Sequence, residues 1–188
     1  MELFMVVLGG KPEGRHTEQH DVFFGIAETL KDLVPEMNRF WPELADRMHI
    51  DSWRKVSQVQ NYHIAVVPKS KLKPETEESS SNKLFFVNLG GYKPEDMEEY
   101  HYKQLVVANS LAEATKIAKA STFWKHHNSS HIDDKYGIDV DDIYEIQDLL
   151  DAHFKSNYHL AIVRSEDDVA DDKLEIGYLK ISKLLSWD

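Results

Sequence analysis

The sequence predicts an α+β fold built as a tandem duplication of a β-β-α-β-β unit. We expect mainly antiparallel sheets, helices on one face of them, and a pseudo-twofold relation between the two copies. Two observations predict this fold. The chain repeats its own motifs in a fixed order, and within each copy apolar runs typical of strands flank one helical stripe. The 188 residues are enough for a sizeable core.

Three blocks of the first copy return in the second copy without a change of order. They are LFMVVLGG at 3–10 and LFFVNLGG at 84–91, HID at 49–51 and 131–133, and NYHIAVV at 61–67 and NYHLAIV at 157–163. We therefore predict a first copy over residues 1–67, a polar linker over 68–83, and a second copy over 84–188. The second copy carries an insertion after HID and an extra C-terminal strand.

The strands are predicted from apolar runs and from residue type. Residues 3–8 and 84–89 are continuous apolar runs, typical of buried central strands. Two glycines follow each run, and we expect them to let the chain leave the strand in an unusual backbone conformation. Residues 102–108 are rich in aromatic and β-branched side chains, which favours a second strand in the unit.

One helix is predicted in each copy after the second strand. Ser110 and Glu113 form a capping box, which predicts a helix that begins near residue 111. Thr29 and Asp32 occupy the same place in the first copy and predict a helix near residue 30. Pro35 is expected to interrupt or restart this first helix.

The remaining strands are predicted from hairpin signals. Residues 53–59 and 62–67 predict a hairpin with a tight turn between them. In the second copy, a longer hairpin loop over 148–156 and a short helix from Asp142 both fit the pattern. Residues 174–181 predict a final strand.

The LFxVxLGG strand, the later histidine, the HID triplet and the Y-H-hydrophobic strand together resemble the bacterial family catalogued as domain of unknown function 1543. The resemblance covers residues 3–67 and 84–163, and the second copy departs from it at the insertion. It implies a small cytoplasmic bacterial protein with one or two copies of the domain. The family has no assigned activity, so the resemblance implies no catalytic residues.

Composition excludes several classes of function. The net charge of −11 argues against nucleic-acid and anionic-lipid partners, which require a basic surface. The absence of cysteine excludes disulfides, thiolate metal sites and cysteine nucleophiles. No apolar run is long enough to span a membrane. Met1 leads directly into a predicted strand without a basic leader, which favours a cytoplasmic protein. The oligomeric state stays open, a homo-oligomer included.

Histidines and aspartates at matched positions predict one divalent-metal site in each copy, because imidazole and carboxylate are good ligands for zinc, manganese and iron. The predicted ligands are His20, His49 and Asp51 in the first copy, and His101, His131 and Asp133 in the second copy. A structural interpretation competes with this one. The aspartate after each histidine can cap a turn, and the histidine can hydrogen-bond the backbone. Apart from such a metal, no cofactor is evident.

The glycine pairs suggest a ligand site but not a phosphate loop, because a strand is predicted to follow them where a helix is needed. The predicted ligand-binding residues are Gly9, Gly10, His20, Gly90, Gly91 and His101. The favoured function is a non-enzymatic module that binds a small molecule or a protein between the two repeats. A metal-dependent hydrolase or other small-molecule enzyme is the alternative, and a structural or assembly protein is the second alternative.

Overall fold

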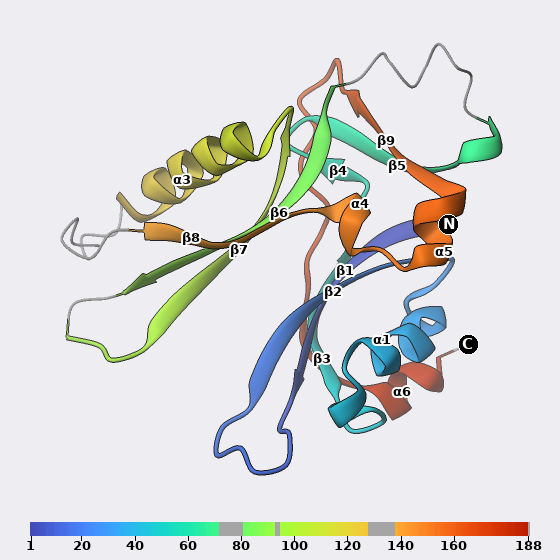
Figure 1. The fold of residues 1–188 in the computed structure, drawn as a ribbon, viewed down its shortest axis with the longest axis vertical. Helices are drawn as coiled ribbons and strands as arrows, with labels where there is room; N and C mark the ends of the chain where they lie inside the picture. The colour runs from blue at the N-terminus through green and yellow to red at the C-terminus, as the bar shows by residue number, and fades with distance from the viewer. Residues whose placement is uncertain (72–80, 93–94, 128–137, 188) are drawn as a thin grey trace. The chain divides into compact units, whose positions relative to one another are not determined.

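The computed structural model describes residues 1–71, 81–92, 95–127 and 138–187, and it confirms the α+β class (Figure 1). Contacts divide the chain into two compact units. Unit 1 comprises Met1–Lys71 and Leu150–Asp188, and unit 2 comprises Leu72–Leu149. The units group the chain differently from the predicted copies, because the last two strands pair with strands of the N-terminal segment.

The main sheet of unit 1, sheet A, has the strand order β10-β3-β1-β2 and is antiparallel. Its strands are β1 (Glu2–Gly10), β2 (Gln19–Ala27), β3 (His49–Lys55) and β10 (Glu175–Lys180). Phe4, Val6 and Leu8 alternate along β1 and are fully buried in the main core. Alternate residues of a strand point to opposite faces, so Gly9 lies on the face opposite this core. The final strand predicted over residues 174–181 is confirmed, because β10 covers Glu175–Lys180.

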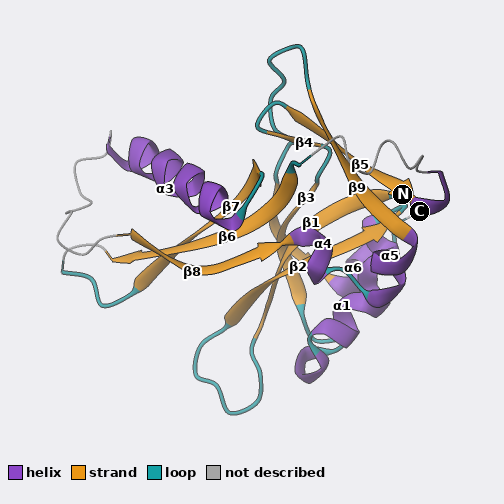
Figure 2. Cartoon of the chain, turned by 45° about the horizontal axis from the view of Figure 1, so that its top comes forward, coloured by secondary structure: helices purple, strands orange, loops and turns teal. Residues whose placement is uncertain are grey.

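Short helices cover the core face of sheet A, and Figure 2 shows α1 and α6 beside each other there. The helices are η1 (Leu30–Leu33), α1 (Val34–Phe40), η2 (Pro42–Leu44) and α6 (Ile181–Leu185). The predicted helix start is confirmed, because Asp32 accepts hydrogen bonds from the Thr29 N–H and hydroxyl at 3.0 and 2.7 Å. Pro35 stands in the first turn of α1, where its missing N–H costs nothing.

A second sheet of unit 1, sheet B, has the order β4-β5-β9. Its strands are β4 (Gln58–Val59), β5 (Tyr62–Pro68) and β9 (Tyr158–Arg164), with η3 (Lys69–Lys71) and α5 (Ala152–Asn157) beside them in the chain. The tight turn is confirmed, because Gln60 and Asn61 both have positive φ, as a two-residue hairpin turn requires. The single strand predicted over 53–59 is wrong. β3 ends at Lys55 and β4 belongs to the other sheet.

The break between β3 and β4 has a physical cause. The Asp172 carboxylate accepts hydrogen bonds from the backbone N–H groups of Ser57 and Gln58, at 2.6 and 2.7 Å, and from the Ser57 hydroxyl at 2.7 Å. These backbone donors are therefore satisfied by a side chain, not by a neighbouring strand. A local sequence pattern could not predict the end of β3, because the carboxylate that causes it is more than a hundred residues away in the chain.

Unit 2 contains sheet C, with the order β7-β6-β8, and one long helix across a face of it (Figure 1). Its elements are β6 (Lys83–Tyr92), β7 (Glu99–Ala108), α3 (Leu111–His127), β8 (Ile138–Glu145) and α4 (Ile146–Leu149). The predicted helix start is confirmed, with Ser110 Oγ accepting the Glu113 N–H at 3.2 Å. The long hairpin loop predicted over 148–156 is wrong, since α4 ends within it and α5 fills most of it.

The glycine pairs do not adopt the unusual backbone conformation that the sequence suggested. Gly9 and Gly10 lie inside β1, and Gly90 and Gly91 lie inside β6. The described glycines with positive φ are Gly14 and Gly177. Gly9, Gly10 and Gly90 instead allow a close approach of side chains, as described below. Most of the predicted linker lies outside the described residues.

The strand arrangement of unit 1 recurs in unit 2. β1 lies between β2 and β3, and β6 lies between β7 and β8. Both central strands shift register against the third strand at matching places, between Val7 and Leu8 and between Asn88 and Leu89. No helix in the described part of the chain has the length and apolar character needed to cross a membrane.

Candidate metal centre

Gly9 is the floor of a side-chain cluster on the face of sheet A that points away from the helices. It is in register with His20 of β2 on one side and with His49 of β3 on the other. A Cβ on Gly9 would lie 2.5 Å from both His49 Nε2 and Asp51 Oδ2, and 3.2 Å from His20 Cδ2. The side chains therefore occupy the space that any other residue would fill. Gly10 points the other way, against Leu44 of the core.

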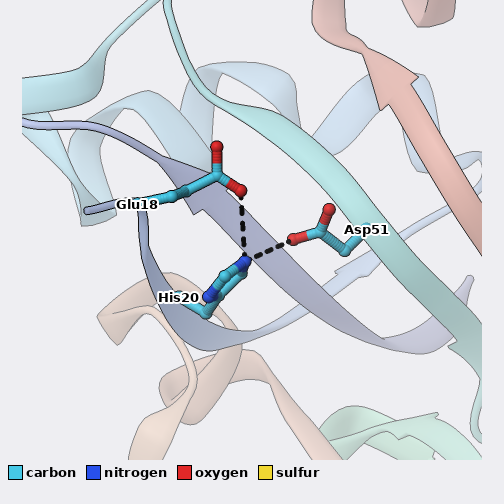
Figure 3. A group of neighbouring side chains, drawn as sticks. All are labelled: Glu18, His20 and Asp51. Atoms are coloured by element: carbon cyan, nitrogen blue, oxygen red, sulfur yellow. Dashed lines mark ion pairs between the residues drawn. The ribbon is translucent and has the colours of Figure 1, made fainter.

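Four side chains, the first donor group, meet above Gly9: Glu18, His20, His49 and Asp51. Figure 3 shows His20 Nε2 between the two carboxylates, 3.2 Å from Glu18 Oε1 and 3.3 Å from Asp51 Oδ2. His49 Nε2 makes a matching pair of contacts, 3.2 Å to Glu18 Oε1 and 3.3 Å to Asp51 Oδ1. Both imidazoles thus share the same two carboxylates. Of the three metal ligands predicted for the first copy, His20 and Asp51 have ligand atoms within 4.8 Å of one another and of Glu18, and His49 joins them through its contacts with the two carboxylates.

The first donor group contains a buried polar atom without a hydrogen bond. The side chain of His49 is 7% exposed, whereas those of His20 and Glu18 are 45% exposed. Among the described residues, neither His49 Nε2 nor Asp51 Oδ2 has a hydrogen-bond partner, although the distances are short enough for one. The atoms therefore converge without the directional geometry of a hydrogen bond. An unsatisfied buried polar atom normally costs about 1–3 kcal/mol, so its presence requires an explanation.

The separations of the donor atoms fit the shell of a metal ion. Ligands about 2.0–2.1 Å from a tetrahedral zinc ion lie roughly 3.3–3.4 Å from one another. The four nitrogen–oxygen distances of 3.2–3.3 Å are close to this value, and the ligand atoms of Glu18, His20 and Asp51 all lie within 4.8 Å of one another. Two imidazoles and two carboxylates are ligands for zinc, manganese or iron. The exposed side, formed by Glu18 and His20, is open to solvent.

Tyr178 of β10 packs against the buried histidine. Its ring centroid lies 4.4 Å from that of His49, with 38° between the planes. The tyrosine side chain itself is largely exposed. One ring face of His49 is therefore in contact with an aromatic side chain from the C-terminal segment.

Unit 2 holds a related cluster above Gly90, the second donor group: Glu99, His101 and Asp141. His101 Nε2 lies 3.3 Å from Asp141 Oδ2 and 3.9 Å from Glu99 Oε2. A Cβ on Gly90 would collide with oxygen atoms of both Asp141 and Glu99. All three side chains are substantially exposed, and no buried histidine is among them.

The second donor group uses different residues from those predicted. Gly9 is in register with His49, and Gly90 is in register with Asp139. The strand positions of His49-Ile50-Asp51 therefore correspond to Asp139-Val140-Asp141, not to the second HID triplet. His131 and Asp133 lie outside the described residues. The two HID triplets match in sequence, but the strand that pairs with β6 begins at Ile138, after the second triplet.

Electrostatic effects at the second donor group are visible in a nearby tyrosine. The negative charge of Glu99 raises the pKa of Tyr92 above its usual value, with smaller contributions from desolvation, from its hydrogen bond to Glu99 and from Asp141. Tyr92 follows directly after Gly91, where unit 1 has Lys11 after Gly10. The hydroxyl of Tyr92 is therefore a natural reporter of charge at this cluster.

Three members of the two donor groups were missed by sequence reasoning: Glu18, Glu99 and Asp141. A signal for the two glutamates was present, because Glu18 and Glu99 each stand two residues before a matched histidine. For Asp141 the signal was the alternation Asp139-Val140-Asp141 near the start of β8, with one apolar residue between two acidic ones. Gly91, also a predicted ligand residue, is buried within β6, opposite Tyr100 in the register.

The comparisons with known proteins give a fold and no activity. Residues 15–66 match the sequence profile of the family described as Domain of Unknown Function (DUF1543), in one copy. This segment includes all four residues of the first donor group. The crystal structure of a protein Il1583 from Idiomarina loihiensis resembles the chain with a TM-score of 0.60 and 22% sequence identity. The match covers 96% of this chain and 97% of that chain, and it shows a shared fold. No curated protein matches the chain.

Proposed function

We propose that the protein is a metal-binding module in which the first donor group holds a divalent transition-metal ion that in turn binds a small ligand. The observation that carries this proposal is the buried Nε2 of His49, which has no hydrogen-bond partner in the described part of the chain and faces two carboxylates. A metal ion satisfies that nitrogen and both oxygens at once. Without an ion, His49 Nε2 and Asp51 Oδ2 are left buried without a hydrogen bond.

The exposure of the donor group supports a role in ligand binding. A metal site that acts on other molecules keeps a coordination position for them, and a site with four protein ligands does so by accepting a fifth ligand from its solvent side. Glu18 and His20 are nearly half exposed, so solvent or a small molecule reaches that side of the group. The proposal places the ligand at the metal. The ligand site predicted between the two repeats stays a prediction.

The proposal includes an internal duplication. The common strand arrangement, the matching register shifts and the two glycine floors all support it. In this proposal the second donor group is the counterpart of the first, altered at the position of His49. The bacterial, cytoplasmic setting that the family resemblance implies belongs to the same proposal.

The decisive experiment is a calorimetric titration of metal-free protein with Zn²⁺ and, separately, with Mn²⁺. We expect saturable binding at the first donor group, and a loss of at least about tenfold in Zn²⁺ affinity, roughly 1.4 kcal/mol, in His49→Ala. His159→Ala is the matched control, because His159 is an exposed histidine of sheet B. Its affinity should equal that of the unmodified protein.

A second variant protects the test against misfolding. Glu18 is half exposed, so Glu18→Gln is expected to fold normally and still to weaken binding by removing one charged ligand. Zn²⁺ at 100 times its Kd should stabilise the unmodified protein by about 2.7 kcal/mol in urea unfolding. The proposal is wrong if folded, unmodified protein binds neither metal, or if both variants bind as it does.

A metal-dependent hydrolase is the second candidate, and the open side of the donor group favours it. A metal ion lowers the pKa of a bound water and so supplies a nucleophile. In this candidate Glu18 would serve as the base that takes the proton of that water, and His20, His49 and Asp51 would hold the ion. Hydrolysis of simple phosphate or carboxylate esters by the zinc-loaded protein, lost in His49→Ala, would support this candidate. Zinc binding without turnover of these esters would favour the binding module.

A further inference from the structure

We infer that Tyr178 is a positioning residue for the metal site, because its ring fixes the plane in which the imidazole of His49 is held. The inference rests on the proposed metal-binding function and adds a residue to it. Tyr178 contributes no ligand atom in this scheme. Its role is carried by the ring contact, with centroids 4.4 Å apart.

The backbone of β10 explains how Tyr178 reaches the histidine. β10 pairs with β3 through Ile176 opposite Ser52 and Leu179 opposite Ile50, so the register shifts between these two pairs. Gly177 lies in the shift with a φ of +142°, a conformation that favours glycine. A bulge of this kind re-aims the next side chain. Here the re-aimed side chain is Tyr178.

The exposure of Tyr178 argues against a role in the core. Its relative exposure is 63%, so a large part of the aromatic ring faces solvent. Leu179, the next residue, supplies the buried contact of β10 with the main core. The ring of Tyr178 thus buries little apolar surface. It covers one face of His49, the histidine of the first donor group that is nearly fully buried.

Orientation of the imidazole determines whether His49 binds a metal well. A ligand histidine must present one nitrogen along the metal–ligand direction, and hydrogen-bonding partners that orient such a ring commonly account for about 10- to 100-fold in metal affinity. A ring contact restricts the same orientation. Stacking restricts rotation of the ring about its last side-chain bond. Without Tyr178, the ring of His49 regains that freedom and loses it again on binding.

The test is a Co²⁺ titration of four variants, followed by visible absorption, which reports ligand geometry. Tyr178→Ala should weaken Co²⁺ binding by about tenfold and alter the absorption spectrum of the bound ion. Tyr178→Phe keeps the ring and should bind as the unmodified protein does. Tyr178→Leu keeps bulk without the ring and should resemble the alanine variant. Ile176→Ala is the matched control, an exposed apolar residue of the same strand.

The outcomes separate this inference from the proposed function. If Tyr178→Ala and Tyr178→Leu bind Co²⁺ with unchanged affinity and spectrum while His49→Ala does not, the positioning role is overturned and the metal site stands. If His49→Ala also binds normally, the proposed function itself fails. A purely structural role for Tyr178 predicts lower stability of the metal-free variants with an unchanged Co²⁺ spectrum, and this result would also overturn the inference.

Discussion

The two donor groups are built on the same strand positions but differ in burial and in ligand type. Each lies above a glycine of a central strand, and each contains a glutamate two residues before a histidine. The first group adds His49, which is almost fully buried and whose Nε2 lies near two carboxylates without a hydrogen bond. In the second group the register position of His49 is held by an aspartate, and the three described members are exposed.

Because of this difference, we regard the first donor group as a metal site and the second as a cluster of exposed charges. Exposed carboxylates near a histidine are satisfied by water and by one another, and such pairs contribute little. A buried imidazole nitrogen has no water to replace its missing partner, so it favours an ion strongly. We therefore expect the first donor group to bind a transition metal tightly, and the second to bind weakly and to prefer harder cations.

The largest effect is expected from Gly9→Ala. The new Cβ would lie 2.5 Å from both His49 Nε2 and Asp51 Oδ2, which is too close for contact, so these two donors must shift. We expect Zn²⁺ affinity at the first donor group to fall by about 100-fold, roughly 2.7 kcal/mol, as measured by calorimetry. Gly90→Ala is the matched variant in unit 2, and it should leave that affinity unchanged. Equal losses in both variants would contradict the distinction between the groups.

A smaller effect is expected when the ligand types are exchanged. His49→Asp gives the first donor group the carboxylate-rich character of the second, so its preference for Zn²⁺ over Mn²⁺ should fall by about tenfold. Asp139→His makes the opposite change, because Asp139 holds the register position of His49, and it should raise the Zn²⁺ preference of unit 2. Competition between the two metals, followed by the Mn²⁺ electron paramagnetic resonance signal, measures both ratios. Unchanged ratios would mean that position, not ligand type, sets the preference.

The smallest effect is a change in the pKa of Tyr92. Because the charge of Glu99 raises this pKa, Glu99→Gln should lower it toward the ordinary value, and a cation bound at the second donor group should do the same. In both cases tyrosinate forms at a lower pH, which ultraviolet absorbance follows. Tyr100 is the internal control, because its raised pKa comes first from a hydrogen bond to Asp96. A shift of Tyr100 alone would contradict the assignment.

Local signals in the sequence were sufficient for most elements but not for sheet membership. The apolar runs gave β1 and β6, and the capping box gave α3, because strand burial and helix capping depend on neighbouring residues. The end of β3 could not be predicted, since Asp172 decides it from a distant segment. The matched HID triplets pointed to Asp133, whereas the register selects Asp141.

The sequence by itself determined the α+β class, the paired glycines and the histidines that gather beside them. These features depend on residue type and short spacing, which a single chain displays directly. Only the tertiary structure decided that Glu18 joins His20, His49 and Asp51, that Tyr178 covers His49, and that the last two strands complete the sheets of unit 1. Those contacts join residues far apart in the chain, and strand register brings them within a few ångströms.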